Sequence, residues 1–158
     1  MSKPEQLSYE EVLEREGKLV AINSGVSMLP LLRQGRDLMV IVKKGGERCK
    51  KYDAVLYKSG GRYVMHRVIK VRENDYVIVG DNCRIFEYGI TDDDILGILV
   101  AVVRDGKREL KMDSLTCRGY AHLWCDLFPL RAFLIRIREL VRAVLRRLKR
   151  LFDREKSR

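Results

Sequence analysis

The sequence predicts a mainly β domain of antiparallel strands, with a short N-terminal helix and a basic amphipathic helical tail at the C-terminus, so that the chain is α+β overall. Apolar and alternating segments follow one another between turn residues from residue 19 to residue 112, which is typical of antiparallel sheets. From about Gly119 onward, apolar residues recur at helical spacing instead. At 158 residues, the chain is long enough for one domain with its own core and an appendage.

The N-terminal helix is predicted by the residues at its two ends. Ser8 and Glu11 have the Ser-x-x-Glu spacing of a capping box, in which each side chain satisfies a free backbone N–H of the first turn. The helix then covers residues 9–16 and ends at Gly17, because glycine readily takes the left-handed conformation at a helix C-terminus. An apolar strand over residues 19–22 follows.

Further strands are predicted between turns. The segments Ser59-Gly60-Gly61, Asn74-Asp75 and Asp105-Gly106 are typical of hairpin connections, and polar residues 33–37 form an earlier turn. Such short connections favour antiparallel neighbours. The predicted strands after the first cover residues 38–43, 54–58, 63–71, 76–79, 95–104 and 108–112.

The C-terminal region is predicted to be helical and amphipathic. A first helix over residues 120–127 is broken by Pro129, which has no backbone N–H to donate. In the longer helix that follows, arginines fill the positions between apolar residues. These apolar residues are Phe133, Ile137, Leu140, Val141, Val144, Leu148 and Leu151. We therefore divide the chain into a β domain with its N-terminal helix at residues 1–116 and a helical tail at residues 117–158.

The positive charge of the chain is concentrated in this tail. Residues 131–158 hold eleven lysines and arginines against three acidic residues, so that +8 of the net charge of +10 lies there. This asymmetry favours an anionic partner, and residues 130–152 are a candidate for contact with an anionic membrane surface. The same apolar stripe could instead pack on the sheet or on a partner protein. Nucleic acid is a weaker candidate because the arginines lack interleaved aromatic residues.

Composition argues against a metal, a cofactor and a membrane span. The four cysteines, at positions 49, 83, 117 and 125, form no Cys-x-x-Cys pair, and two histidines alone could join them. The N-terminus leads into an acidic helix, and no apolar run approaches the ~20 residues of a spanning helix. We therefore expect no signal peptide, no transmembrane helix and a cytoplasmic location, either free or peripheral on the inner face of the membrane.

The segment Ser24-Gly25-Val26-Ser27-Met28-Leu29-Pro30 is the candidate for chemistry. Glycine lets the backbone approach a ligand closely, and proline fixes the exit from the turn. A rigid corner that presents one hydroxyl and free backbone N–H groups suits nucleophilic catalysis. An ordinary Ser-Gly turn is the simpler interpretation of these residues taken alone.

A catalytic serine needs a base, and His66 is the one histidine outside the tail. Strand alternation puts His66 on one face with Val64, whereas Met65 and Arg67 lie on the other. Lys43 and Lys70 are alternative bases. Lys70 lies on the same strand face as His66 but more than about 10 Å further along the strand, which is too far to serve the same hydroxyl. A second nucleophile, Cys83, is a weak alternative because no other base is predicted near it.

Three motifs together resemble a known family. The serine segment, then His66-Arg67-Val68, then Gly80-Asp81-Asn82 resemble, in this order, the superfamily of serine peptidases that holds the signal peptidases and the self-cleaving LexA-like repressors. The serine segment is similar to the Ser-Gly-x-Ser-Met of the repressors, and Pro30 is typical of signal peptidases. A histidine at the base position is typical of the eukaryotic, archaeal and sporulation-type signal peptidases, whereas bacterial signal peptidases and the repressors carry lysine. The resemblance covers about residues 21–103 and implies the β fold of that superfamily.

The resemblance also implies roles for individual residues. Ser27 would be the nucleophile and His66 its general base. The orienting acid would be Glu87, where the histidine branch usually has aspartate, with Asp81 as the second choice or as a structural residue of the turn. The Ser27 N–H would stabilise the oxyanion. Support of the oxyanion or of the turn would come from Ser24, Gly25, Met28 and Pro30, the last two packing beneath the nucleophile.

We therefore expect a serine endopeptidase that cleaves a peptide or protein in trans, for example at leader or signal-type segments. Histidine needs little help to act as a base near neutrality, because its ordinary pKa is about 6.5. Self-cleavage is disfavoured because neither a helix-turn-helix nor the Ala-Gly or Cys-Gly bond that repressors cleave precedes the serine segment. The alternative is a catalytically silent binding module of the same fold, whose basic tail docks on an anionic membrane, a protein partner or nucleic acid.

Overall fold

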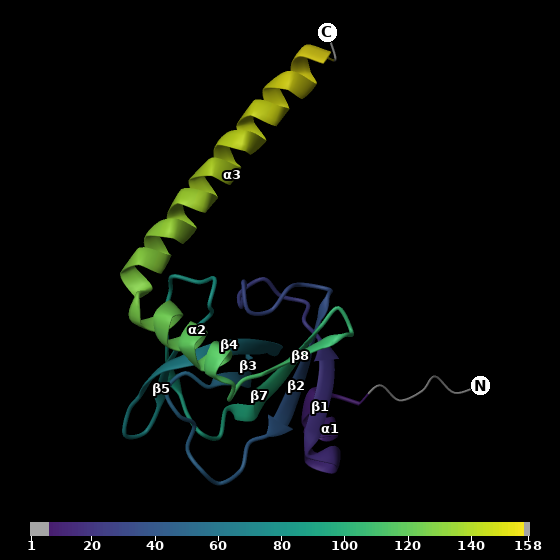
Figure 1. Cartoon of the computed structure of the whole chain (residues 1–158), viewed down its shortest axis with the longest axis vertical. Coiled ribbons are helices and arrows are strands. Elements are labelled where there is room, and N and C mark those ends of the chain that lie inside the picture. The colour runs from purple at the N-terminus through teal and green to yellow at the C-terminus, as the bar shows by residue number, and fades with distance from the viewer. Residues whose placement is uncertain (1–6, 157–158) are drawn as a thin grey trace, which may run out of the picture.

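The computed structural model describes residues 7–156, except for the side chains of Glu139, Leu148 and residues 150–156. Eight strands and three helices follow one another in this part of the chain (Figure 1). Their order is α1 (Tyr9–Glu16), β1 (Lys18–Ile22), β2 (Asp37–Lys43), β3 (Ala54–Ser59), β4 (Arg62–Val71), β5 (Tyr76–Val79), β6 (Glu87–Ile90), β7 (Ile95–Arg104), β8 (Arg108–Lys111), α2 (Leu115–Asp126) and α3 (Phe128–Lys156).

The strands form one antiparallel sheet in the order β1-β2-β7-β3-β4-β5-β6, and β8 pairs with β7. The mainly β class and seven of the strands are therefore confirmed, with ends shifted by a residue at most. The strand β6 was not predicted, because its Glu-Tyr-Gly-Ile sequence shows no alternation and Gly89 has a φ of +77°. Only two pairs, Tyr76 with Ile90 and Ile78 with Glu87, join β6 to β5.

The two faces of the sheet carry separate apolar clusters. One cluster includes Leu56 and Met65 and is covered by Leu13 of α1 and by Met28 and Leu32 of the loop between β1 and β2, which we call the serine loop. The other cluster consists of Cys49, Val55, Tyr57, Val68, Tyr76, Ile78 and Ile95. Adjacent residues of β3 and β4 thus enter opposite clusters, as strand alternation requires.

The N-terminal helix has the predicted ends. The Ser8 hydroxyl accepts a hydrogen bond from the Glu11 N–H at 3.2 Å, and the Glu11 carboxylate accepts one from the Ser8 N–H at 2.6 Å. Gly17 ends the helix with a φ of +68°. The capping box and the glycine stop are therefore both confirmed.

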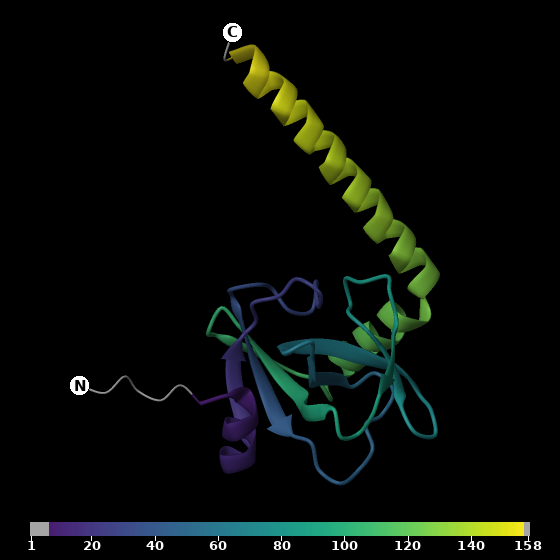
Figure 2. The same ribbon diagram turned by 180° about the vertical axis from the view of Figure 1, so that it is seen from behind.

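The C-terminal helices differ in where they lie. α2 begins at Leu115, capped by Ser114, so the predicted boundary between residues 116 and 117 falls in its first turn. α2 packs on the body, whereas α3 rises away from it as a long rod (Figures 1 and 2). The predicted break at Pro129 is confirmed, because Pro129 stands in the first turn of α3, where a missing N–H costs no hydrogen bond. None of the helices in the described part of the chain is both long and apolar enough to cross a bilayer.

Candidate active site

The serine segment lies in the loop between β1 and β2 and is held at both ends. The Asn23 side-chain amide donates to the Gly25 carbonyl at 2.8 Å, and its oxygen accepts from the Gly25 N–H at 3.3 Å. Met28 is buried in the core, and Ser27 just before it is half-buried. The loop is therefore held before Ser27 by the hydrogen bonds of Asn23 and after Ser27 by the buried side chain of Met28.

A second segment, the Gly80-Asp81-Asn82 turn after β5, is joined to the serine loop. The Asn82 N–H donates to the Ser27 carbonyl at 2.6 Å, and the Asn82 side-chain amide donates to the Val26 carbonyl at 3.0 Å. Gly80 has no space for a side chain, since a Cβ there would lie 2.7 Å from Ser27 O and 2.9 Å from His66 Nε2. The serine loop, the turn and His66 of β4 therefore meet at Gly80.

His66 is held from its other ring nitrogen. Its Nδ1 lies 2.6 Å from a Glu87 carboxylate oxygen, and the side chain of His66 is almost fully buried. The Tyr57 hydroxyl donates to the second Glu87 oxygen at 2.7 Å and lies 3.1 Å from His66 Nδ1. A neutral imidazole that carries its proton on Nδ1 donates it to Glu87, which leaves Nε2 as the acceptor on the side of Ser27.

The protonation of His66 follows from this environment. Burial lowers the pKa of His66 below its ordinary value of 6.5, and the nearby Glu87 carboxylate counteracts this only in part. The imidazole is therefore neutral near pH 7 and able to accept a proton. The pKa of the Tyr57 hydroxyl is raised, first by burial and then by its bond to Glu87, so Tyr57 stays a hydrogen-bond donor.

Ser27 itself presents polar groups that no other residue in the described part of the chain engages. Its hydroxyl makes no hydrogen bond to any described residue, His66 included, and the N–H groups of Ser27 and Met28 donate to none of them either. Catalytic hydrogen bonds commonly form only when substrate is bound. Two adjacent free N–H groups beside a hydroxyl are the donors that an oxyanion requires.

The other residues of the serine segment divide between core and surface. Ser24 is exposed, and its carbonyl accepts a hydrogen bond from the Gln34 side chain at 2.7 Å. The expected position beneath the nucleophile is found for Met28 but not for Pro30, which is exposed. Met28 is apolar and extends into the core, whereas Pro30 lies on the outer side of the turn.

The Asp81 carboxylate is hydrogen-bonded to residues other than His66. Its two carboxylate oxygens accept from Arg67 at 2.8 and 2.7 Å, and one of them also accepts from the Tyr120 hydroxyl at 2.9 Å. The Asp81 carbonyl accepts from the Trp124 indole at 2.7 Å. Since Asp81 is fully buried, this network joins α2 to the sheet. Of the two candidate acids, Glu87 is the one in contact with His66.

The alternative bases and the alternative nucleophile are also placed. Lys43 pairs with Glu14 of α1 at 2.6 Å, and Lys70 is exposed. Cys83 lies on the side of His66, since a Cβ at Gly80 would be 2.8 Å from its Sγ and 2.9 Å from His66 Nε2. Burial, and then Glu87, raise the pKa of the Cys83 thiol, so that it is protonated near neutrality and a poor nucleophile.

Tyr57 is the site residue that the sequence reasoning missed. Val55 of β3 pairs with His66, so Tyr57, two residues further along β3, lies on the same face of the sheet as His66. The signal was present in the sequence, since a hairpin around Gly60-Gly61 fixes this register. Finding it required the pairing of two strands and not the pattern of either one.

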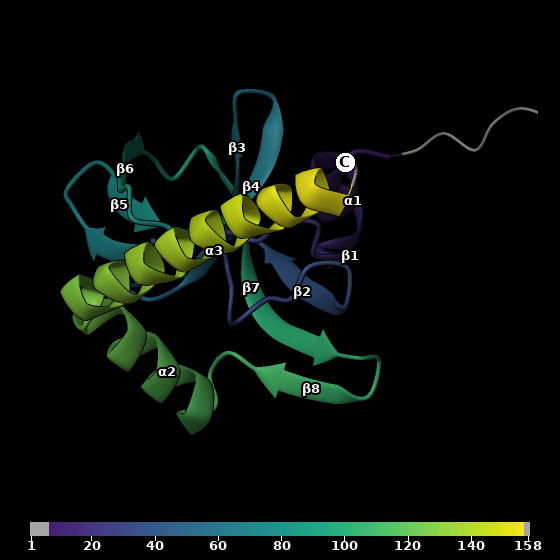
Figure 3. The same ribbon diagram turned by 90° about the horizontal axis from the view of Figure 1, so that it is seen from above.

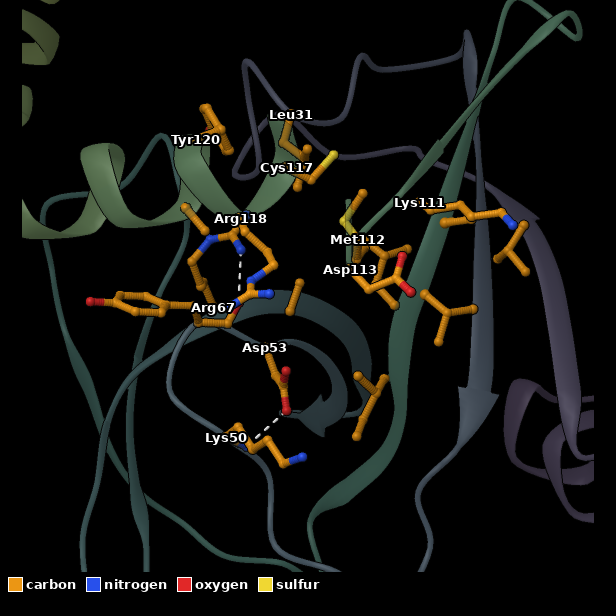
Figure 4. Close-up of a pocket in the computed structure, with 18 of the residues that line it drawn as sticks. Leu31, Lys50, Asp53, Arg67, Lys111, Met112, Asp113, Cys117, Arg118 and Tyr120 are labelled. Atoms are coloured by element: carbon orange, nitrogen blue, oxygen red, sulfur yellow. Dashed lines mark hydrogen bonds between the residues drawn. The ribbon is translucent and has the colours of Figure 1, made fainter. Parts of the chain in front are cut away.

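A cleft of about 790 Å³ lies elsewhere, between α2 and the other face of the sheet. Figure 4 shows Asp53, Arg67 and Cys117 around it. Arg67 lines this cleft, whereas its neighbour in the chain, His66, faces the opposite side. The residues that line the cleft do not include Ser27, His66 or Glu87.

Comparisons with family models, with curated proteins and with solved structures found no match to this chain. A buried, neutral histidine is held by a carboxylate on one ring nitrogen, and its other nitrogen faces the loop of a serine with free backbone donors. Such an arrangement can remove a proton from a hydroxyl and stabilise the charge that results.

Proposed function

We propose that the chain is a serine endopeptidase in which Ser27 is the nucleophile and His66 the general base. The observation that carries this proposal is the position of His66, with Nδ1 on Glu87 and Nε2 against the Ser27 loop at Gly80. An acid, a histidine and a serine in this order make up a catalytic triad, which is recognised by geometry and not by position in the sequence.

The proposed reaction has two steps. His66 Nε2 takes the proton of the Ser27 hydroxyl as the oxygen attacks the peptide carbonyl, and the protonated imidazole then gives this proton to the leaving amine. In the second step, His66 takes a proton from water as the water oxygen attacks the Ser27 ester. The protonated imidazole then returns this proton to the Ser27 oxygen, which leaves as the free hydroxyl while the acid product is released. Glu87 stabilises the charged imidazole in both steps. The N–H groups of Ser27 and Met28 are the donors available to the oxyanion.

The motifs support a more specific proposal. Their order along an antiparallel sheet favours membership of the superfamily of signal peptidases and LexA-like repressors, in its histidine branch, together with the β fold of that superfamily. The substrate would then be a peptide or protein cleaved in trans, such as a leader or signal-type segment.

The test is cleavage of a diverse peptide library at neutral pH, read by mass spectrometry. Ser27→Ala and His66→Ala should each lower the rate of every cleavage by at least about 10³-fold, because each removes a member of one unit. Ser59→Ala, the same change at an exposed serine at the end of β3, should leave the cleavages unchanged. Cys83→Ala should also retain them.

Two results would contradict the proposal. Cleavage that survives Ser27→Ala but is lost in Cys83→Ala would assign the chemistry to the thiol beside His66. A wild-type protein that cleaves no peptide, alone or with anionic vesicles, would favour the silent binding module with the same fold.

A further inference from the structure

The exposed face of α3 is unusually apolar for a helix in water. Seven of its apolar side chains, spaced to form one stripe, are between 42 % and 60 % exposed. They are Phe133, Leu134, Ile137, Leu140, Val141, Val144 and Leu145. Contiguous exposed apolar surface of this kind marks an interaction site. The expectation for Leu148 and Leu151 lies outside the described side chains.

Arginines border this stripe on both sides. On a helix that turns about 100° per residue, the apolar side chains cover an arc of about 140°. Arg136 and Arg147 follow along one edge, and Arg138 lies at the other, with Arg142 further round the helix. An apolar face between two basic borders is the pattern of helices that lie in a lipid interface.

The body of the protein contacts α3 along the flank on which Arg138 lies, outside the apolar arc. Arg131 and Ile135 are the two buried residues of the described helix, and both lie away from the apolar arc. The Arg131 guanidinium donates to the Cys83 carbonyl at 3.3 Å. The stripe therefore faces outward, with nothing of the described chain covering it.

From these observations, we propose that α3 docks the protein on an anionic lipid surface. Charge decides between lipid and a second copy of this chain. Glu139 is the only acidic residue between positions 131 and 150, so two such helices packed together would repel each other along their length. Anionic headgroups complement the exposed arginines beside the arc, namely Arg136, Arg142 and Arg147, while the acyl region takes up the apolar arc.

α3 also contacts the loop 80–86, which is hydrogen-bonded to the serine loop through Asn82. The Arg138 guanidinium donates to the Asn82 side-chain oxygen, and Phe86 and Phe128 are in ring contact at 4.5 Å between centroids. The loop 23–36 and the loop 80–86 lie at the end of the body from which α3 rises (Figures 1 and 3). Docking would keep Ser27 near the lipid surface. If the proposed function holds, its substrates are therefore peptide segments presented at that surface.

The experiment measures co-sedimentation of the Ser27→Ala protein with vesicles, so that binding is read independently of catalysis. The vesicles contain phosphatidylcholine alone or phosphatidylcholine with phosphatidylglycerol. We expect binding to the anionic vesicles to be more than tenfold tighter and to weaken with added salt. Arg136→Gln with Arg147→Gln should remove most of this preference.

A matched pair of variants tests the apolar stripe. Leu134→Gln with Val141→Gln changes two residues that are each 51 % exposed, and should lower the affinity for anionic vesicles more than tenfold. Val20→Gln with Ile22→Gln changes two residues of β1 that are 54 % and 58 % exposed, and should leave it unchanged. Circular dichroism verifies that both variants are folded.

Three outcomes would overturn the proposal. One is wild-type protein that stays in the supernatant with anionic vesicles at low salt. Another is equal loss of binding in the α3 and β1 variants, which would show that the stripe has no special part. The third is a dimer in sedimentation velocity that the α3 variant abolishes while vesicle binding persists, which would assign the stripe to a second copy.

Discussion

The imidazole of His66 is positioned at both ring nitrogens. The Glu87 carboxylate contacts Nδ1, and the backbone of Gly80 lies next to Nε2. The short contact to Glu87 fixes the tautomer, and the Tyr57 hydroxyl holds the second oxygen of the same carboxylate. Gly80 is needed because any Cβ would lie 2.7 Å from a backbone oxygen, and backbone cannot move aside as a side chain can. At this scale, the site consists of a few residues whose positions depend on one another.

For the proposed cleavage, the burial of His66 predicts a pH dependence. Because the pKa of His66 is lowered from 6.5, its neutral, basic form dominates above that value. We expect kcat/KM to rise with pH through a midpoint below about 6.5 and to be level near neutrality. In Glu87→Gln, the loss of a charge that favours the imidazolium should lower the midpoint further and reduce kcat about 10²- to 10⁴-fold.

The measurement is the pH profile of kcat/KM for wild type and Glu87→Gln on one peptide. A wild-type midpoint well above 6.5 would mean that the charge of Glu87 outweighs burial.

The burial of His66 also makes the stability of the protein depend on pH. Since the unfolded state binds the proton more readily, His66 lowers the free energy of unfolding as the pH falls below about 6.5.

Among the elements, α2 is the one whose attachment depends on a buried charge. Arg67 and Asp81 form an ion pair with both side chains almost completely buried, and Tyr120 and Trp124 of α2 donate to the same aspartate. The helix therefore packs on the sheet through the residue that follows Gly80. The turn at the candidate site and the start of the helical region form one unit.

We expect Asp81→Asn to act on stability. It leaves the Arg67 charge buried without its partner, which should lower the free energy of unfolding by about 3–5 kcal/mol in urea titrations. Glu87→Gln, by contrast, changes a half-buried acid at the site and should alter stability by less than about 1 kcal/mol while it impairs cleavage. The opposite pattern would exchange the roles of the two acids.

The elements also separate what sequence can predict from what it cannot. α1, the strand at Tyr76–Val79 and β7 were predicted to the residue, because a capping box and apolar alternation are local signals. The start of α2 at Leu115 was missed by five residues, since its first turn has no apolar stripe of its own. The meeting of Ser27, His66 and Glu87 depends on strand pairing, and only the resemblance to a known family brought these residues together in advance.

The whole molecule consists of a body that buries its core and a helix that adds little to that core. Past Ile135, every side chain of α3 that the structure describes is exposed or half-buried. The sheet, α1, α2 and the first turns of α3 therefore supply the buried apolar area, which is the main source of stability. The C-terminal part of α3 contributes positive charge and not buried apolar area.

Removal of residues 139–158 should accordingly leave folding intact. Because no buried side chain of the described chain is lost, we expect the free energy of unfolding, measured by urea titration, to change by less than about 1 kcal/mol. Removal from residue 114 onward also deletes Tyr120, Trp124 and Arg131, exposes one face of the Arg67–Asp81 pair, and should cost several times more. Equal losses in the two truncations would mean that the outer part of α3 packs on the body in solution.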